Sequence, residues 1–306
     1  MKEINAPKPI KLLDIDAYSP LQIADRIDKV ATVKAKLTFA QTFMLGILAG
    51  VYIGFGAQFA TLATSDSTLH FGLTSLIAGT VFSFGLMLVV IAGAELFTGN
   101  CLIIMGYVSR RITTREMLNN WIVSFIGNLV GSLTLVFWIY KSHQWELFHH
   151  MVGGKALLIA NTKVNLDFNA AFARGVLCNS MVCLAIWLCF SGRSVADKVM
   201  SIVFPIGGFV ASGFEHCVAN MYFIPIGVLL KKNAAVVAAA EKMAGKTLDL
   251  SHLTWKGFFI DNLVPVTIGN IVGGVILVGI MFWFVYLRPQ INLSFSVKQD
   301  FFRDKK

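Results

Sequence analysis

The chain has 306 residues, of which 56% are hydrophobic and only 14% are charged, with a net charge of +9. Its mean hydropathy of +0.69 is too high for an ordinary soluble domain. The basic residues are spread over the termini and loops and form no basic face interleaved with aromatic residues, which argues against a nucleic-acid partner.

The N-terminal segment, residues 1–36, is polar and contains no apolar core of a signal peptide, so we expect insertion to depend on internal hydrophobic segments. Residues 19–37 are predicted to form an amphipathic helix, in which Ser19 is the N-cap, Pro20 takes the first helical position and Gln22 completes a capping box. This helix could lie along the membrane surface or dock on the cytosolic side of the protein; the pattern allows both.

Six hydrophobic spans are predicted after this segment. We place them at 37–63, 72–109, 116–141, 167–191, 198–230 and 255–287. The second and fifth are too long for one straight crossing, and each has a polar cluster near its middle, "AELFTGN" at 94–100 and "FEHCVAN" at 214–220. Two long crossings with polar interruptions predict two discontinuous helices.

The short loops indicate the orientation. An even number of spans places both termini on one side of the membrane. The loops at 109–115 and 192–198 would share that side and are rich in Arg and Lys, whereas 64–71 has neither. The positive-inside rule therefore favours a cytoplasmic N-terminus and a cytoplasmic tail at 288–306. The loop expected at 231–256 disagrees, because it carries five lysines on the outer side.

The two halves of the chain resemble each other. "GILAG" at 46–50 corresponds to "GVLCN" at 175–179, "ELFTGN" at 95–100 to "EHCVAN" at 215–220, and "IGNLVG" at 126–131 to "IGNIVG" at 268–273. With three spans in each half, the second copy must be upside down in the bilayer. We therefore expect a channel domain at 37–287 built from inverted repeats at about 37–141 and 167–287, an arrangement found in many transport folds.

Polar residues in the broken spans need partners, because hydrocarbon cannot satisfy freed backbone groups. Glu95, Asn100, Glu215 and Asn220 are suited to holding the broken ends together, and direct contact with a substrate is the alternative. The paired Gly-Asn dipeptides at 127–128 and 269–270 are interpreted as close helix packing.

Several residues point away from metal or redox chemistry. The five cysteines all lie in apolar stretches without a CxxC pair. His143, His149 and His150 lie close together but lack partners at ligand spacing, so we interpret them as part of a solvated loop. We expect no metal, no cofactor and no catalytic residues.

The quoted motifs, together with "RGVLCNSMVCLAIW" at 174–187, resemble the formate/nitrite transporter family, and the match is closest to its formate channels. The resemblance covers about 19–287. It implies an all-α membrane protein with an aquaporin-like fold of six transmembrane helices, an inverted repeat and two broken helices. It also implies a homopentamer with one pore in each protomer, surrounded by membrane lipid in a bacterial inner membrane. The implied substrates are small monovalent weak-acid anions, most closely formate.

The resemblance also assigns roles to individual residues. His216 corresponds to the central pore histidine, Asn179 to a group that hydrogen-bonds it, and Thr98 to the loop that breaks the second span. Lys163 resembles a lysine that draws the anion in. One constriction is implied at Leu96, Phe97 and Val182 and the other at Phe82, Leu86 and Phe209.

The chemistry expected of His216 follows from its surroundings. Burial disfavours the charged imidazole and a nearby anion favours it, and the two effects oppose each other in a side chain that titrates near neutral pH. We therefore expect a neutral donor at rest that becomes a cation, or a proton source, when an anion arrives.

Alternative functions remain open at this point. Nitrite or hydrosulfide could replace formate as the substrate, because all three are small and weakly acidic. A water or glycerol channel is disfavoured because the paired Asn-Pro-Ala signature is absent. A membrane-embedded metalloenzyme using Glu215, His216 and the loop histidines is an alternative from another class, but an enzyme would not need two matched broken helices.

Overall fold

The computed structural model describes residues 17–288, and within this range the regular elements are all helical. Five helices are long and apolar enough to cross a membrane, and α10 and α11 reach that length only together, with a bend of 115° between them. The bounds are α1 Pro20–Ala35, α2 Phe39–Thr64, α3 Phe71–Met87, η1 Leu88–Gly93, α4 Phe97–Asn100, η2 Cys101–Ile103, α5 Ile104–Val108, α6 Thr114–Lys141, η3 Gln144–Glu146, α7 Met151–Val164, α8 Phe168–Ser191, α9 Val195–Ala211, α10 Cys217–Leu230, α11 Ala234–Ala244, η4 Gly257–Leu263, α12 Val264–Ile271, η5 Val272–Ile280 and η6 Trp283–Leu287.

Polar side chains mark where the helices begin. The predicted capping box at Ser19 and Gln22 is present at the start of α1. Helices α2, α6 and α9 begin in the same way, and Asp167 accepts a hydrogen bond from Ala170 at the start of α8. These side chains satisfy N–H groups that a helix end leaves unpaired.

Both long crossings are broken at the predicted places. The second consists of α3 and η1, which end at Gly93 with a φ of +83°, an extended stretch at 94–96, and then α4. The fifth consists of α9, a turn containing Gly213 with a φ of +68°, and then α10 from Cys217. Glycine suits both turns because it enters the left-handed region without steric cost.

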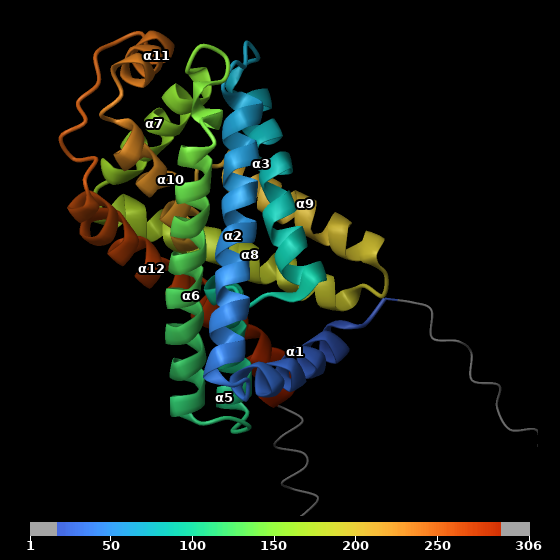
Figure 1. Cartoon of the computed structure of the whole chain (residues 1–306). Helices are drawn as coiled ribbons and strands as arrows, with labels where there is room; N and C mark the ends of the chain where they lie inside the picture. Colours follow the sequence, from blue (N-terminus) through green and yellow to red (C-terminus); the bar gives the residue numbers. More distant parts are fainter. Residues whose placement is uncertain (1–16, 289–306) are drawn as a thin grey trace, which may run out of the picture.

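The helices of the two repeats pack in matching pairs, α2 against α6 and α8 against α12 (Figure 1). A Cβ on Gly46 would lie 3.2 Å from the Cα of Gly127, and a Cβ on Gly175 would lie 3.2 Å from the Cα of Gly269. Each repeat therefore brings two helix backbones together at glycines, as expected from the Gly-Asn dipeptides.

Three shorter helices lie at the two ends of this bundle. Figure 1 shows α1 across one end of α2 and α6, while α7 and α11 lie at the other. The expectation of a loop over 231–256 is wrong for 234–244, where Asn233 caps the alanine-rich helix α11. Residues 1–16 of the predicted N-terminal segment and 289–306 of the predicted tail lie outside the described residues.

Candidate functional site

Two asparagines hold the broken ends of the long crossings. Asn128 on α6 accepts a hydrogen bond from the N–H of Phe97 at 2.9 Å, and its Nδ2 donates to the carbonyls of Gly46 and Glu95. Asn270 on α12 repeats all three contacts with Cys217, Gly175 and Glu215. From the sequence, these Gly-Asn pairs predict only close packing; in the structure the asparagine side chains also satisfy backbone groups freed by the breaks.

A polar cluster lies beside the first break. Lys34 Nζ lies 2.7 Å from Glu95 Oε1 and 3.0 Å from Asn100 Oδ1. Asn100 Nδ2 donates to Glu95 Oε2 at 2.7 Å and to Asn120 Oδ1 at 2.8 Å. The Glu95 side chain is only 5% exposed, so its charge needs these partners.

An equivalent polar cluster lies beside the second break. Lys163 Nζ lies 2.8 Å from Glu215 Oε1, and Asn220 Nδ2 donates to Glu215 Oε2 at 2.7 Å. Asn220 also donates to Asn262 Oδ1, and Asn262 donates to the carbonyl of Lys163. Contacts of this kind were predicted for Glu95, Asn100, Glu215 and Asn220. Lys34, Asn120 and Asn262 were missed, and aligning the repeat beyond the three short matches would have pointed to Lys34.

His216 and Thr98 join the two breaks at the middle of the molecule. His216 Nε2 lies 2.9 Å from Thr98 Oγ1, and both side chains are buried. His216 is the N-cap of α10, and its Nδ1 accepts the N–H of Ala219 at 3.0 Å. Because Nδ1 is an acceptor, the neutral ring carries its hydrogen on Nε2 and donates it to Thr98. The hydroxyl hydrogen of Thr98 then remains available for another acceptor.

The predicted hydrogen bond between Asn179 and His216 is wrong. Asn179 Nδ2 donates to the carbonyls of Thr98 at 3.2 Å and Asn270 at 2.7 Å. The backbone carbonyls of the broken segment 94–100 need hydrogen-bond donors inside the protein. The carbonyl of Thr98 therefore competes with His216 for the amide of Asn179. Asn179 thus fixes the backbone of the residue that contacts His216.

Buried apolar side chains lie on both sides of this pair. The rings of Phe82 and Phe209 meet edge to face at 5.8 Å, and Phe209 stacks on His216 at 6.0 Å. Phe223, which was not predicted, stacks on Phe82 at 6.4 Å. The other residues expected at constrictions are all buried, namely Leu86, Leu96, Phe97 and Val182.

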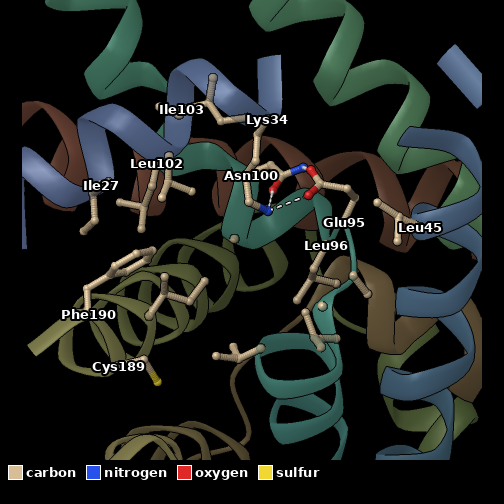
Figure 2. A pocket seen from close by; sticks show the side chains of 18 residues that line it. Ile27, Lys34, Leu45, Glu95, Leu96, Asn100, Leu102, Ile103, Cys189 and Phe190 are labelled. Atoms are coloured by element: carbon tan, nitrogen blue, oxygen red, sulfur yellow. Dashed lines mark hydrogen bonds and ion pairs between the residues drawn. The ribbon is translucent and has the colours of Figure 1, made fainter. Parts of the chain in front are cut away.

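Two cavities approach the centre from opposite ends. The α1 vestibule, of about 320 Å³, is lined by Lys34, Glu95, Asn100, Leu45, Leu96 and Phe190 among others. Figure 2 shows Lys34, Glu95 and Asn100 gathered together, with Ile27, Leu102 and Phe190 on another side of the cavity. The α7 vestibule, of about 670 Å³, is lined by Lys155, Lys163, Arg174, Phe82, Phe209 and His216 among others.

The loop histidines lie away from this site. His143 is exposed and lies 2.7 Å from Glu146, and its ring packs near Trp145. Within residues 17–288, no group of three or more His, Cys, Asp or Glu side chains is arranged to hold a metal ion.

Comparison with known proteins identifies the family. Residues 21–284 match the family model described as formate/nitrite transporter. The chain belongs to the formate/nitrite transporter family. This confirms the resemblance inferred from the motifs. The chain is 41% identical over 280 residues to the formate channel FocA of Escherichia coli K12, covering 89% of this chain and 96% of that protein.

Further relatives agree with this assignment. FocA of Haemophilus influenzae is 41% identical over 269 residues, covering 86% of this chain and 93% of that protein. A solved structure described as a pentameric formate channel with formate bound matches at a TM-score of 0.72 and 39% identity, covering 82% of this chain and 98% of that chain. The fold is therefore the predicted multi-pass helical membrane fold, and the relatives are named as channels, not enzymes.

Proposed function

We propose that this chain is a transmembrane channel for small monovalent weak-acid anions, with formate as the principal substrate. The observation that carries the proposal is the buried His216–Thr98 pair, which lies between two vestibules that each contain a lysine. The names of the relatives support formate in preference to nitrite or hydrosulfide.

Lys34 and Lys163 provide the first interaction with an entering anion. Each lines a vestibule, and each is partly exposed while its paired carboxylate is almost fully buried. The ammonium groups can therefore attract an anion, whereas Glu95 and Glu215 are shielded. Attraction at the mouth lowers the cost of removing the anion from water.

Apolar side chains then exclude water and hydrated ions. Phe82, Leu86 and Phe209 form the constriction on the α7 side, and Leu96, Phe97 and Val182 form the one on the α1 side. Moving a bare carboxylate into such surroundings costs on the order of 20 kcal/mol in a medium of dielectric constant about 4. Protonation to the neutral acid removes most of this cost.

His216 and Thr98 act on the anion between the constrictions. At rest the neutral imidazole donates from Nε2 to Thr98, and the Thr98 hydroxyl donates to the arriving anion. Protonation of His216 would have to occur at Nδ1 and would break its bond with the Ala219 N–H. The cation therefore forms only when the anion is close enough to offset that loss, by uptake of a proton from water in the α7 vestibule, which His216 lines. The Nε2 proton then passes to the oxygen of Thr98 as the Thr98 hydroxyl proton passes to the anion, which leaves the ring neutral with its hydrogen on Nδ1.

The proposed assembly is a homopentamer in a bacterial cytoplasmic membrane, with a channel unit at 37–287 and both termini in the cytoplasm. The pentamer is supported by the solved relative. The orientation is supported by the basic loops at 109–115 and 192–198, which lie at the same end of the molecule as α1: Arg111 pairs with Asp28, and Ser191 accepts a hydrogen bond from Tyr18.

Uptake into proteoliposomes tests the function directly. Labelled formate, nitrite and hydrosulfide should be compared at two pH values, with empty liposomes as the control. We expect saturable formate uptake that increases as the pH falls. His216→Phe should abolish the pH dependence; an unchanged pH profile in this variant would contradict the role of His216. Absence of any anion uptake by the wild-type pentamer would contradict the function itself.

A further inference from the structure

The α7 vestibule contains two cationic side chains that the proposed mechanism does not use. Lys155 and Arg174 both line it, together with Lys163. Glu215 is its only lining carboxylate among the described residues and is already paired with Lys163 at 2.8 Å. Arg174 makes one side-chain hydrogen bond, from Nη1 to the carbonyl of Gly213 at 3.4 Å, which leaves most of its donors free.

The helical register places Lys155 on the cavity wall. Residues 155, 159, 162 and 163 follow the spacing of one face of α7, and all four line the vestibule. Lys155 is therefore two turns, about 12 Å along the helix, from Lys163. Burial lowers the pKa of Lys155, and a bound anion would favour its charged form.

The inverted repeat shows that the positive charge of Arg174 has no equivalent in the α1 vestibule. The Glu215 N–H donates to the carbonyl of Arg174 at 3.3 Å, and the Glu95 N–H donates to the carbonyl of Leu45 at 3.2 Å. Leu45 is thus the counterpart of Arg174, and it lines the α1 vestibule with an apolar side chain.

The counterpart of Lys155 does not line the α1 vestibule. Lys34 and Lys163 are equivalent, so the same register along the helix makes Arg26 the counterpart of Lys155. Arg26 donates to the carbonyl of Phe190 and lies 3.9 Å from the centre of the Tyr18 ring, and it is not among the lining residues. One lysine and one glutamate therefore provide the charge in the α1 vestibule, whereas the α7 vestibule has an excess of two positive charges.

We propose that Lys155 and Arg174 form a holding site for a small carboxylate or similar oxyanion, which gives the channel a higher affinity for anions that enter through the α7 vestibule. The planar guanidinium of Arg174 can donate to both oxygens of a carboxylate, and Lys155 adds a second charge. This inference rests on the proposed function and adds to it an asymmetry between the two mouths.

The test compares half-saturation for formate from each face. Pentamers are reconstituted, and the population facing each way is selected by cleaving a terminal tag with a protease that cannot cross the membrane. Lys155→Gln and Arg174→Gln should each raise the half-saturation concentration from the α7 side by roughly twofold to fivefold. The value from the α1 side and the maximal rates should not change. Arg174→Lys should restore part of the affinity.

Lys232→Gln is the matched control, because Lys232 is exposed, lies near the same end of the molecule and does not line the vestibule. Equal half-saturation from both faces of the wild type would overturn the inference. So would unchanged values in both variants, or equal changes on both sides. Elution as an intact pentamer shows that a variant is folded. If the proposed channel function itself is wrong, the wild type will transport no formate from either face, so this outcome can be told apart from failure of the inference about Lys155 and Arg174.

Discussion

The Nε2 atom of His216 lies 2.9 Å from the Oγ1 atom of Thr98, and these residues come from the two different broken helices. Each residue is the point at which one inverted repeat reaches the centre of the molecule. Since Nδ1 of His216 is occupied by the Ala219 N–H, the ring can direct only its Nε2 hydrogen toward Thr98. The hydroxyl of Thr98 therefore keeps its own hydrogen available for another acceptor, which is the role proposed for it with an anion.

Thr98→Val should reduce formate uptake by about tenfold or more, because valine keeps the shape but removes the hydroxyl donor. Thr98→Ser keeps the donor and should retain most of the uptake. The measurement is initial uptake in proteoliposomes containing equal amounts of pentamer. Equal rates for the valine and serine variants would show that the hydroxyl is not needed.

Asn270→Ala should destabilise the protein by about 2 kcal/mol, since it removes three buried hydrogen bonds of the kind that average below 1 kcal/mol in membranes. Asn128→Ala should have a similar effect. The control is Asn165→Ala, because Asn165 is exposed and bonds only within its own helix end. Thermal unfolding in detergent measures the difference, and a loss for Asn165→Ala as large as for Asn270→Ala would contradict the stabilising role of the Asn270 side chain.

Lys163→Gln should destabilise the protein by about 3 kcal/mol, because it leaves the Glu215 carboxylate buried without a cation. Adding Glu215→Gln should recover most of this loss by removing the unpaired charge. The double variant should still show a raised half-saturation concentration for formate, since the attracting ammonium is absent. Thermal unfolding and uptake kinetics separate the two effects; a double variant less stable than Lys163→Gln would refute the pairing argument.

The attachment of α1 should depend on pH through Asp28. Its side chain is only 1% exposed and pairs with Arg111 at 2.5 Å, yet burial outweighs that pairing and raises the pKa of Asp28. A carboxyl with a raised pKa in the docked state favours docking when protonated. This contribution is complete below the pKa of the undocked group and is lost as the pH rises through the raised value.

Arg111→Gln should therefore weaken the docking of α1 most at about pH 8, and the defect should diminish toward about pH 5. Hydrogen exchange of the amides in α1 measures docking. Asp28→Asn is the matched variant, and it should dock about equally at both pH values. A defect in Arg111→Gln that is the same at both pH values, or that grows on acidification, would contradict the role assigned to the ionisation of Asp28.

Much of the fold could be predicted because it depends on local signals. The spans follow from apolar runs of bilayer length, and both breaks follow from polar residues that cannot remain in hydrocarbon without partners. The start of α1 follows from the capping box at Ser19. Helices α7 and α11 were missed because they are too short to give a membrane signal.

The site was predicted less completely because partners come from distant segments. Glu95 and Glu215 stand out in the sequence, but nothing local indicates that Lys34 and Lys163 are their cations. Asn179 was assigned to His216 by resemblance, whereas its amide is held by the carbonyls of Thr98 and Asn270. Choosing among acceptors within hydrogen-bond reach requires coordinates, because a shift of about one ångström changes the partner.

The equivalence of Lys34 and Lys163 changes how the N-terminal segment should be regarded. Because Lys34 lies on α1, a shortened protein starting at Thr38 would retain all the long spans and yet present the carboxylate of Glu95 alone to an approaching anion. One mouth would become repulsive while the other stayed attractive. We therefore expect helix α1, through Lys34, to contribute to anion entry as much as the spans do.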